Sequence, residues 1–206
     1  MLYIIDHPII KVKLSRMRNK DTDSKAFRSN LVELSELMAY EVTKNYHTTT
    51  FPIQTPLGPT NGYRMQEKIV LVPVLRAGLG MVDGFKLIIP QAPIGFIGLY
   101  RNEKTLKPIE YYCKMPESIY GANIIVLDPM LATGHSASRA ISILKEYKPK
   151  TIKLACIVSV KAGINEVQKH HKDVDIYVAA VDKKLDKNGY IVPGLGDAGD
   201  RIFGTK

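Results

Sequence analysis

Cysteine is scarce in this chain, and long apolar runs are missing. Only Cys113 and Cys156 occur among 206 residues, which is too few for a disulfide framework and lacks the paired spacing of a cysteine metal site. No stretch approaches the roughly 20 continuous apolar residues that a membrane span needs, and the first residues do not have the layout of a signal peptide. We therefore expect a cytoplasmic protein with no membrane partner and no cysteine-bound metal.

The best-known nucleotide-binding signatures are also missing. No glycine loop is followed by Gly-Lys-Ser or Gly-Lys-Thr, so the sequence does not support a P-loop. Gly78, Gly80 and Gly84 miss the spacing of the dinucleotide fingerprint by one residue, so a Rossmann cofactor site is not supported either. Any phosphate site must be of another kind.

Acidic residues are outnumbered by basic ones. The chain has 29 Lys and Arg against 20 Asp and Glu, a formal net charge of +9, which favours anionic partners such as a polyphosphate metabolite, a nucleotide or a nucleic acid. The net charge does not distinguish among these anionic partners. Residues 11–20 hold five of the basic residues, and we expect a solvated face there.

Apolar runs alternate with helical patterns along most of the chain. Apolar residues recur at steps of three and four over residues 23–46, which predicts a long helix with one buried face. Prolines and glycines at 52–62 then predict a loop or short hairpin. Beyond them, apolar runs predict buried strands, and amphipathic segments between the strands predict helices. The strands are expected at 69–75, 94–99, 124–127, 152–160 and 174–181, and the helices at 79–89, 136–147 and 164–171.

This alternation predicts an α/β fold, with a mostly parallel sheet flanked by helices. The length and the 45% hydrophobic content predict a single domain over residues 1–206, with the N-terminal helices and residues 182–206 as appendages. Ligands of such sheets bind beyond the carboxyl ends of the strands, where the strand order reverses. The loops to inspect for chemistry follow Leu75, Leu99, Leu127 and Val181.

Residues 123–136 carry the strongest functional signal. Four apolar residues, 124–127, lead through Asp128 into a loop of small and hydroxylated residues that opens a helix. The unpaired N–H groups of a first helical turn favour a phosphate, and Thr133 and Ser136 add hydroxyl donors. Asp128, at the rim, suits a sugar hydroxyl or a hydrated metal. A ribose phosphate is therefore the first hypothesis, and a plain capped turn is the alternative.

Two further loops offer basic side chains. Arg76 stands above a turn of small residues at 76–80 and suits forked contacts with phosphate oxygens, although glycines for helix packing explain that turn equally well. Residues 100–114 predict an excursion from the sheet. A basic arm that closes over an anionic ligand has this composition, and so has an ordinary exposed hairpin.

Residues 190–200 form the most unusual loop. Pro193, Gly194, Gly196 and Gly199 fall within eight residues, so the backbone can approach a ligand closely. Fixed backbone N–H and C=O groups can distinguish a keto oxygen from an amino group, because the wrong ligand leaves a buried polar group unpaired. A planar heterocycle suits this loop, and a C-terminal tail tied down by turns is the alternative.

Together these four loops resemble the uracil phosphoribosyltransferases, a branch of the type I phosphoribosyltransferases. The resemblance covers nearly the whole chain and is most specific at 75–80, 100–102, 128–134 and 190–200. It implies the type I phosphoribosyltransferase fold, with an excursion hairpin arm and a small C-terminal hood that binds the base. It also implies the reaction of uracil with phosphoribosyl pyrophosphate (PRPP) to give UMP and diphosphate in pyrimidine salvage.

The resemblance also implies roles for individual residues. Arg76 and Arg101 would grip the diphosphate, and Asp197, close to both base and ribose, is the candidate for removing the N1 proton of uracil. The residues implied in catalysis are Asp197, Arg101 and Asp128. Those implied in PRPP binding are Arg76, Arg101, Asp128, Pro129, Met130, Leu131, Ala132, Thr133, Gly134, His135, Ser136 and Asp197. Those implied in uracil binding are Ile191, Gly196, Asp197 and Ala198.

Two positions distinguish the chain within this resemblance. Many type I enzymes have two adjacent acids where this chain has Asp128 and Pro129, and the single acid is typical of the uracil branch, so it favours uracil over purines. His135 replaces the second glycine of the commoner Thr-Gly-Gly-Ser pattern. We expect its side chain to face solvent, with a protonatable neighbour of the phosphate as the alternative.

The resemblance extends to partners. It implies magnesium bound mainly through diphosphate and water, with no dedicated protein ligand, and a homo-oligomer that is a dimer or larger. GTP activates part of the family and is therefore a candidate activator. An RNA-binding regulator on the same fold is the main rival, favoured by the charge of +9 and by residues 11–20, although nucleic acid is not the expected partner. A related transferase acting on purines is the second rival.

Overall fold

The computed structural model describes residues 1–101 and 108–205, except for the side chain of Arg101. The strands are β1 (Leu2–Ile4), β2 (Thr48–Thr55), β3 (Gly58–Met65), β4 (Ile69–Leu75), β5 (Phe96–Arg101), β6 (Pro108–Lys114), β7 (Asn123–Leu127), β8 (Met130–Leu131), β9 (Thr151–Val160), β10 (Asp175–Asp182), β11 (Lys184–Leu185) and β12 (Ile191–Val192). The helices are α1 (Pro8–Arg18), α2 (Ser24–Thr43), α3 (Leu79–Ile88), the short 3-10 helix η1 (Glu117–Ile119), α4 (His135–Glu146), α5 (Lys161–His170) and α6 (Ala198–Phe203).

A mostly parallel sheet forms the centre of the molecule. Its strand order is β1-β10-β9-β7-β4-β5-β6, with the short β8 paired to β9, and only the β5–β6 pair is antiparallel. From β4 the chain moves outward to β5 and β6, then returns to place β7 on the other side of β4. The strand order therefore reverses between β4 and β7, so the sequence-based prediction of an α/β fold is confirmed.

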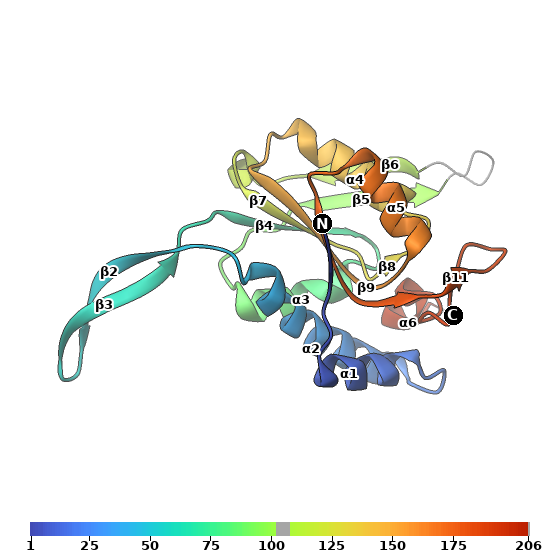
Figure 1. Cartoon of the computed structure of the whole chain (residues 1–206), viewed down its shortest axis with the longest axis horizontal. Helices are drawn as coiled ribbons and strands as arrows, with labels where there is room; N and C mark the ends of the chain where they lie inside the picture. Colours follow the sequence, from blue (N-terminus) through green and yellow to red (C-terminus); the bar gives the residue numbers. More distant parts are fainter. Residues whose placement is uncertain (102–107, 206) are drawn as a thin grey trace.

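Alternate side chains along the strands of the sheet pack into two apolar cores, one on each face. Ile69 and Leu71 of β4 point to the core that contains α1, α2, α3 and α6, whereas Val70 and Val72 point to the core under α4 and α5. Figure 1 shows the two helical layers on opposite sides of the strands. Each face of the sheet is therefore covered by helices.

Helix α2 follows the predicted pattern closely. The carboxylate of Asp23 accepts a hydrogen bond from the backbone N–H of Ala26 at 2.7 Å and caps the helix. Its buried side chains recur at helical spacing, and α3 packs so tightly on it that a Cβ on Gly84 would lie 2.3 Å from the carbonyl oxygen of Val32. The helix ends at Thr43, three residues before the predicted boundary.

Two sequence-based expectations need correction. The prolines and glycines at 52–62 lie in a long hairpin of two eight-residue strands, β2 and β3, which projects from the body (Figure 1). Proline is tolerated there because a two-stranded hairpin has only edge strands. The basic residues at 11–20 were expected to be a solvated face; most are exposed, but Lys13 and Arg18 are partly buried, Arg18 at the end of α1.

The cysteines and the helices add two further observations. Cys156 is buried within β9, as an apolar side chain would be, and both cysteines are free. In the described part of the chain, no helix has both the length and the apolar character needed to cross a bilayer.

Candidate active site

The loops after β4 and β7 meet at the carboxyl edge of the sheet. Pro73 of β4 lies opposite Leu127 of β7 in the parallel register, so Arg76 and Asp128 begin neighbouring loops. A Cβ on Gly78 would lie 2.3 Å from the carbonyl oxygen of Leu127, which shows that the first loop rests directly on the end of β7. Glycine is required at this position by that close approach, and the two loops form one continuous surface.

The loop from Asp128 to Ser136 is anchored on both sides. The carbonyl oxygen of Pro129 accepts hydrogen bonds from the backbone N–H groups of Ile157 and Val158, both at 3.1 Å, and β8 then pairs with β9. Gly134 has φ +82°, a left-handed conformation that glycine adopts without strain. A Cβ there would lie 2.6 Å from the carbonyl oxygen of Gly163 at the start of α5. The loop is therefore held between β9 and α5.

Helix α4 opens this loop toward the site without a side-chain cap. No side chain accepts a hydrogen bond from its first turn at Gly134. The N–H groups of a first helical turn have no partner inside the helix and carry partial positive charge. Thr133 is partly buried and Ser136 is exposed beside this turn. This part of the site favours an anion with several oxygens.

Asp128 follows the last residue of β7 and is partly buried. One carboxylate oxygen, Oδ1, accepts a hydrogen bond from the backbone N–H of Met130 at 3.2 Å. Burial raises the pKa of Asp128 to about 7, and the hydrogen bond from Met130 opposes part of that rise. The carboxyl group therefore changes charge near neutral pH.

His135 stands at the first position of α4, on the side of the loop that faces α5. Its ring is 51% exposed, and its Nε2 atom lies 3.8 Å from Oε1 of Glu166. The same oxygen of Glu166 lies 3.4 Å from Nε2 of His170, one helical turn further along α5. The imidazole thus lies between solvent and the α5 carboxylate.

The C-terminal hood reaches back to the Arg76 loop. Asp197 caps α6, because its Oδ1 accepts a hydrogen bond from the N–H of Asp200 at 3.0 Å. Asp200 Oδ1 in turn lies 3.5 Å from Nη2 of Arg76. A Cβ on Gly199 would lie 3.3 Å from Asp197 Oδ1 and 3.7 Å from Arg76 Nη2. The candidate base-binding and diphosphate-binding residues are therefore neighbours.

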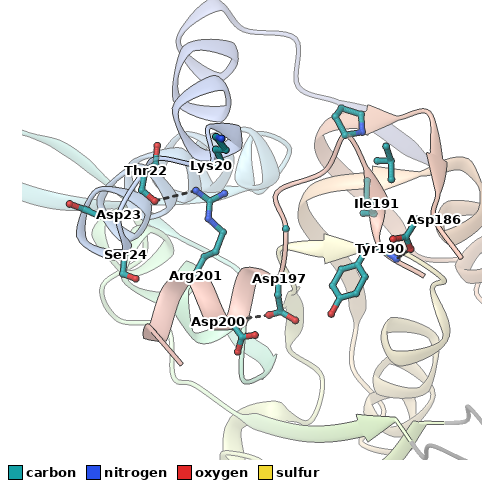
Figure 2. Close-up of a pocket in the computed structure, with 13 residues that line it drawn as sticks. Lys20, Thr22, Asp23, Ser24, Asp186, Tyr190, Ile191, Asp197, Asp200 and Arg201 are labelled. Atoms are coloured by element: carbon teal, nitrogen blue, oxygen red, sulfur yellow. Dashed lines mark hydrogen bonds between the residues drawn. The ribbon is translucent and has the colours of Figure 1, made fainter. Parts of the chain in front are cut away.

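A cavity of about 670 Å³ opens beneath the hood. Figure 2 shows Tyr190 and Ile191 on one side, the segment from Lys20 to Ser24 on the other, and Asp197, Asp200 and Arg201 between them. Gly196 also lines it, whereas Ala198 is buried at the start of α6. Three of the four predicted uracil-binding residues thus face one cavity.

The remaining predicted arginine is only partly placed. The backbone of Arg101 ends β5, but its side chain and the following residues 102–107 lie outside the described part of the structure. Of the two arginines predicted to grip the diphosphate, Arg76 is therefore the one whose side chain the structure describes.

Sequence reasoning missed three residues that shape the hood. Arg18 and Asp182 form an ion pair behind it, and Arg201 joins it to the linker between α1 and α2. Arg201 directly follows the loop at 190–200 in the sequence, and this position could have marked it as a residue of the hood. The partner of Arg18 lies 164 residues away, so its burial had no local signal.

Among residues 1–101 and 108–205, no group of three or more histidine, cysteine or acidic side chains is placed to hold a metal ion. The loops of the candidate site carry the carboxylates Asp128, Asp197 and Asp200, which do not form such a group. Oxygen ligands of this type suit Mg²⁺, which usually keeps several waters and binds through substrate phosphates as well.

Comparison with known proteins agrees with this geometry. The chain is 59% identical over 206 residues to the uracil phosphoribosyltransferase of Malacoplasma penetrans, covering 100% of both chains. It superposes on the solved AQ2163 protein from Aquifex aeolicus with a TM-score of 0.95 and 36% identity, over 100% of this chain and 99% of that one.

A more distant structure shares the fold. The purine phosphoribosyltransferase of Pyrococcus horikoshii matches with a TM-score of 0.53 and 16% identity, over 75% of this chain and 84% of that one. The profile of the family described as uracil phosphoribosyltransferase matches residues 4–205. With this match across almost its whole length, the chain belongs to the uracil phosphoribosyltransferase family.

Proposed function

We infer that this protein transfers the phosphoribosyl group of PRPP to N1 of uracil, giving UMP and diphosphate, as a cytoplasmic enzyme of pyrimidine salvage. The observation that carries this inference is the meeting of three loops in a member of the family. An uncapped helix start, an exposed arginine and a glycine-rich hood converge at one edge of the sheet. They match the three parts of the substrates: a phosphate, a diphosphate and a planar base.

PRPP would be bound along the loops after β4, β5 and β7. The backbone N–H groups at the start of α4, with the hydroxyls of Thr133 and Ser136, suit the 5-phosphate. Asp128 suits the ribose hydroxyls, since a carboxylate accepts two hydrogen bonds. The two arginines Arg76 and Arg101 would neutralise the diphosphate. The full proposed set is Arg76, Arg101, Asp128, Pro129, Met130, Leu131, Ala132, Thr133, Gly134, His135, Ser136 and Asp197.

Uracil would be recognised by the hood. Ile191, Gly196 and Ala198 would contribute mainly backbone groups, and Asp197 would stand between base and ribose. Two carbonyl oxygens and an N–H on one edge of uracil require donors and an acceptor in a fixed arrangement. Cytosine carries an amino group where uracil carries a keto oxygen, so it would leave a hood group unpaired.

The proposed reaction separates charge at C1 of the ribose. Diphosphate departs as the sugar gains positive character, and N1 of uracil attacks from the opposite face. The chain would align the two substrates, offset the charge on departing diphosphate with Arg76 and Arg101, and take the N1 proton on Asp197. Magnesium, when bound with the diphosphate, would supply further charge neutralisation.

The direct test is turnover of uracil with PRPP and Mg²⁺. We expect UMP and diphosphate in equal amounts, with a parallel assay containing GTP to reveal activation. A chain without turnover that binds RNA, with affinity falling steeply as salt rises, would instead favour the RNA-binding regulator.

The Arg101→Ala variant tests the grip on the diphosphate. We expect kcat/KM for PRPP to fall by about tenfold or more, because a charge-assisted contact to the departing group is lost. The melting temperature should stay the same, since Arg101 is the last residue of β5 rather than part of its interior. Lys114→Ala, on the adjacent β6, is the matched control and should behave as wild type. Unchanged kinetics in Arg101→Ala would remove this residue from the site.

We also propose that the chain acts as one catalytic domain and assembles into a homo-oligomer. The β2–β3 hairpin supports the second proposal. An isolated two-stranded hairpin is at best marginally stable in water, yet this one exposes Leu57 and Tyr63. A second copy of the chain would cover such side chains.

A further inference from the structure

A closed hydrogen-bonded ring lies behind the hood. Arg18, at the end of α1, donates from Nη1 and Nη2 to the two carboxylate oxygens of Asp182, at 2.7 and 2.6 Å. Asp182 Oδ2 also accepts from the N–H of Gly194 at 2.9 Å, and the carbonyl oxygen of Gly194 accepts from Arg18 Nη1 at 2.9 Å. Both backbone groups of Gly194 are therefore fixed by one ion pair.

The ion pair is largely shielded from solvent. The side chain of Asp182 is 7% exposed and that of Arg18 is 23% exposed. A forked arginine–carboxylate contact in such a place combines two charge-assisted hydrogen bonds with a fixed geometry.

Arg201 holds the next residue of the hood in a similar way. Its guanidinium donates to the carbonyl oxygen of Leu195 at 2.9 Å and to that of Asn19 at 2.7 Å, with a further contact to Met17. It also lies 4.4 Å from the ring centre of Phe27. The hood is thus attached at two successive residues to the N-terminal helices.

These two attachments lie between the proposed base-binding positions. Ile191 precedes Gly194 and Leu195, and Gly196 follows them directly. Gly194 has φ +61°, and a Cβ there would lie 2.1 Å from the carbonyl oxygen of Ile191. A segment with this many glycines cannot fix its own peptide orientations. Its orientation must come from outside, and the ring supplies it.

We propose that Arg18 is a positioning residue for base recognition, acting through Asp182 and Gly194 to fix the backbone groups of the hood. The proposal rests on the proposed function, because it assumes that the hood binds uracil. A protein that identifies a base mainly by backbone groups needs those groups held in place before the base arrives. Arg18 does not line the cavity beneath the hood. Because it acts on the hood through Gly194, its effect should appear in uracil binding rather than in PRPP binding.

The experiment compares Arg18→Ala with Arg16→Ala, which removes an exposed arginine from the same helix. We expect Arg18→Ala to raise KM for uracil about tenfold or more, which is the effect of losing one charge-assisted hydrogen bond. KM for PRPP should stay within about twofold of wild type. Hydrogen exchange at the Gly194 amide should become faster. Arg16→Ala should match wild type in all three measurements.

Arg18→Lys covers the case in which Arg18→Ala does not fold. Lysine keeps the charge beside Asp182 but lacks the rigid planar fork that meets both carboxylate oxygens, so KM for uracil should rise to an intermediate value. If the Arg18 variants have wild-type turnover and an unchanged KM for uracil, the role of Arg18 is overturned while the proposed function stands. An equal rise in KM for uracil and for PRPP would also overturn the role of Arg18. If wild type makes no UMP, the proposed function fails, and hydrogen exchange at Gly194 still decides whether Arg18 fixes the hood.

Discussion

Replacing Asp128 with asparagine should nearly abolish UMP formation while making the folded protein more stable at pH 8. The variant keeps the shape of the side chain but removes the charge proposed to accept hydrogen bonds from the ribose. Loss of one preorganised electrostatic contact costs a factor of about a hundred or more in turnover. Activity and stability should therefore move in opposite directions.

The gain in stability follows from the pKa of Asp128. Burial raises it in the folded chain from 3.8 to about 7, so between these values the folded state keeps a proton that the unfolded state has released. Stability must then fall as pH rises through this window, and the loss is complete above about pH 7. The variant has no such group. Its advantage in melting temperature should be largest at pH 8 and should shrink toward pH 4.

Asp173→Asn is a control, because the pKa of Asp173 is shifted in the opposite direction to that of Asp128. Its hydrogen bond from Lys145 holds the pKa of Asp173 below the usual range, so removing this carboxylate should not stabilise the protein at pH 8. Its turnover should be that of wild type, because Asp173 lies far from the loops of the site. An Asp128→Asn variant with normal kcat, or with no gain in melting temperature at pH 8, would contradict the assignment.

The second large effect is expected for Asp197→Asn. Turnover should fall about a hundredfold or more if Asp197 takes the N1 proton of uracil, since a positioned base contributes at least that much. The fold should be intact, because asparagine is as good an N-cap as aspartate and can still accept the hydrogen bond from Asp200. The measurement is kcat against pH, together with the melting temperature.

Asp197→Ala separates the two roles of this residue. It removes the cap as well as the charge, so it should lower the melting temperature, whereas Asp197→Asn should not. Near-normal rates in Asp197→Asn would exclude it as the base. A loss of rate confined to Asp197→Ala would mean that the cap of α6, rather than the carboxylate charge, matters for turnover.

The parts of this fold that the sequence predicts well are those with a strong local pattern. The apolar run at 69–75 gives β4 with the same bounds, because a strand buried on both faces has a continuous apolar sequence. The order of strands and helices then places the loops after Leu75 and Leu127 side by side, since carboxyl ends of parallel strands share an edge. The main loops of the candidate site were predictable for this reason.

The parts that the sequence predicts poorly depend on distant partners. Residues 11–20 have the composition of a solvated face, and only the folded chain brings Arg18 to Asp182. The length of the β2–β3 hairpin was underestimated because proline and glycine normally indicate a loop. That rule does not hold for a hairpin that projects from the body of the protein.

The three loops of the candidate site are proposed to select one base and one sugar phosphate together. A panel of bases supplied with PRPP and Mg²⁺ tests this claim most directly. We predict rapid UMP formation from uracil, with kcat/KM for cytosine, hypoxanthine and guanine lower by about a thousandfold or more, because a hood that hydrogen-bonds uracil leaves polar groups unpaired with each of the others. Turnover of a purine at a rate close to that of uracil would contradict it.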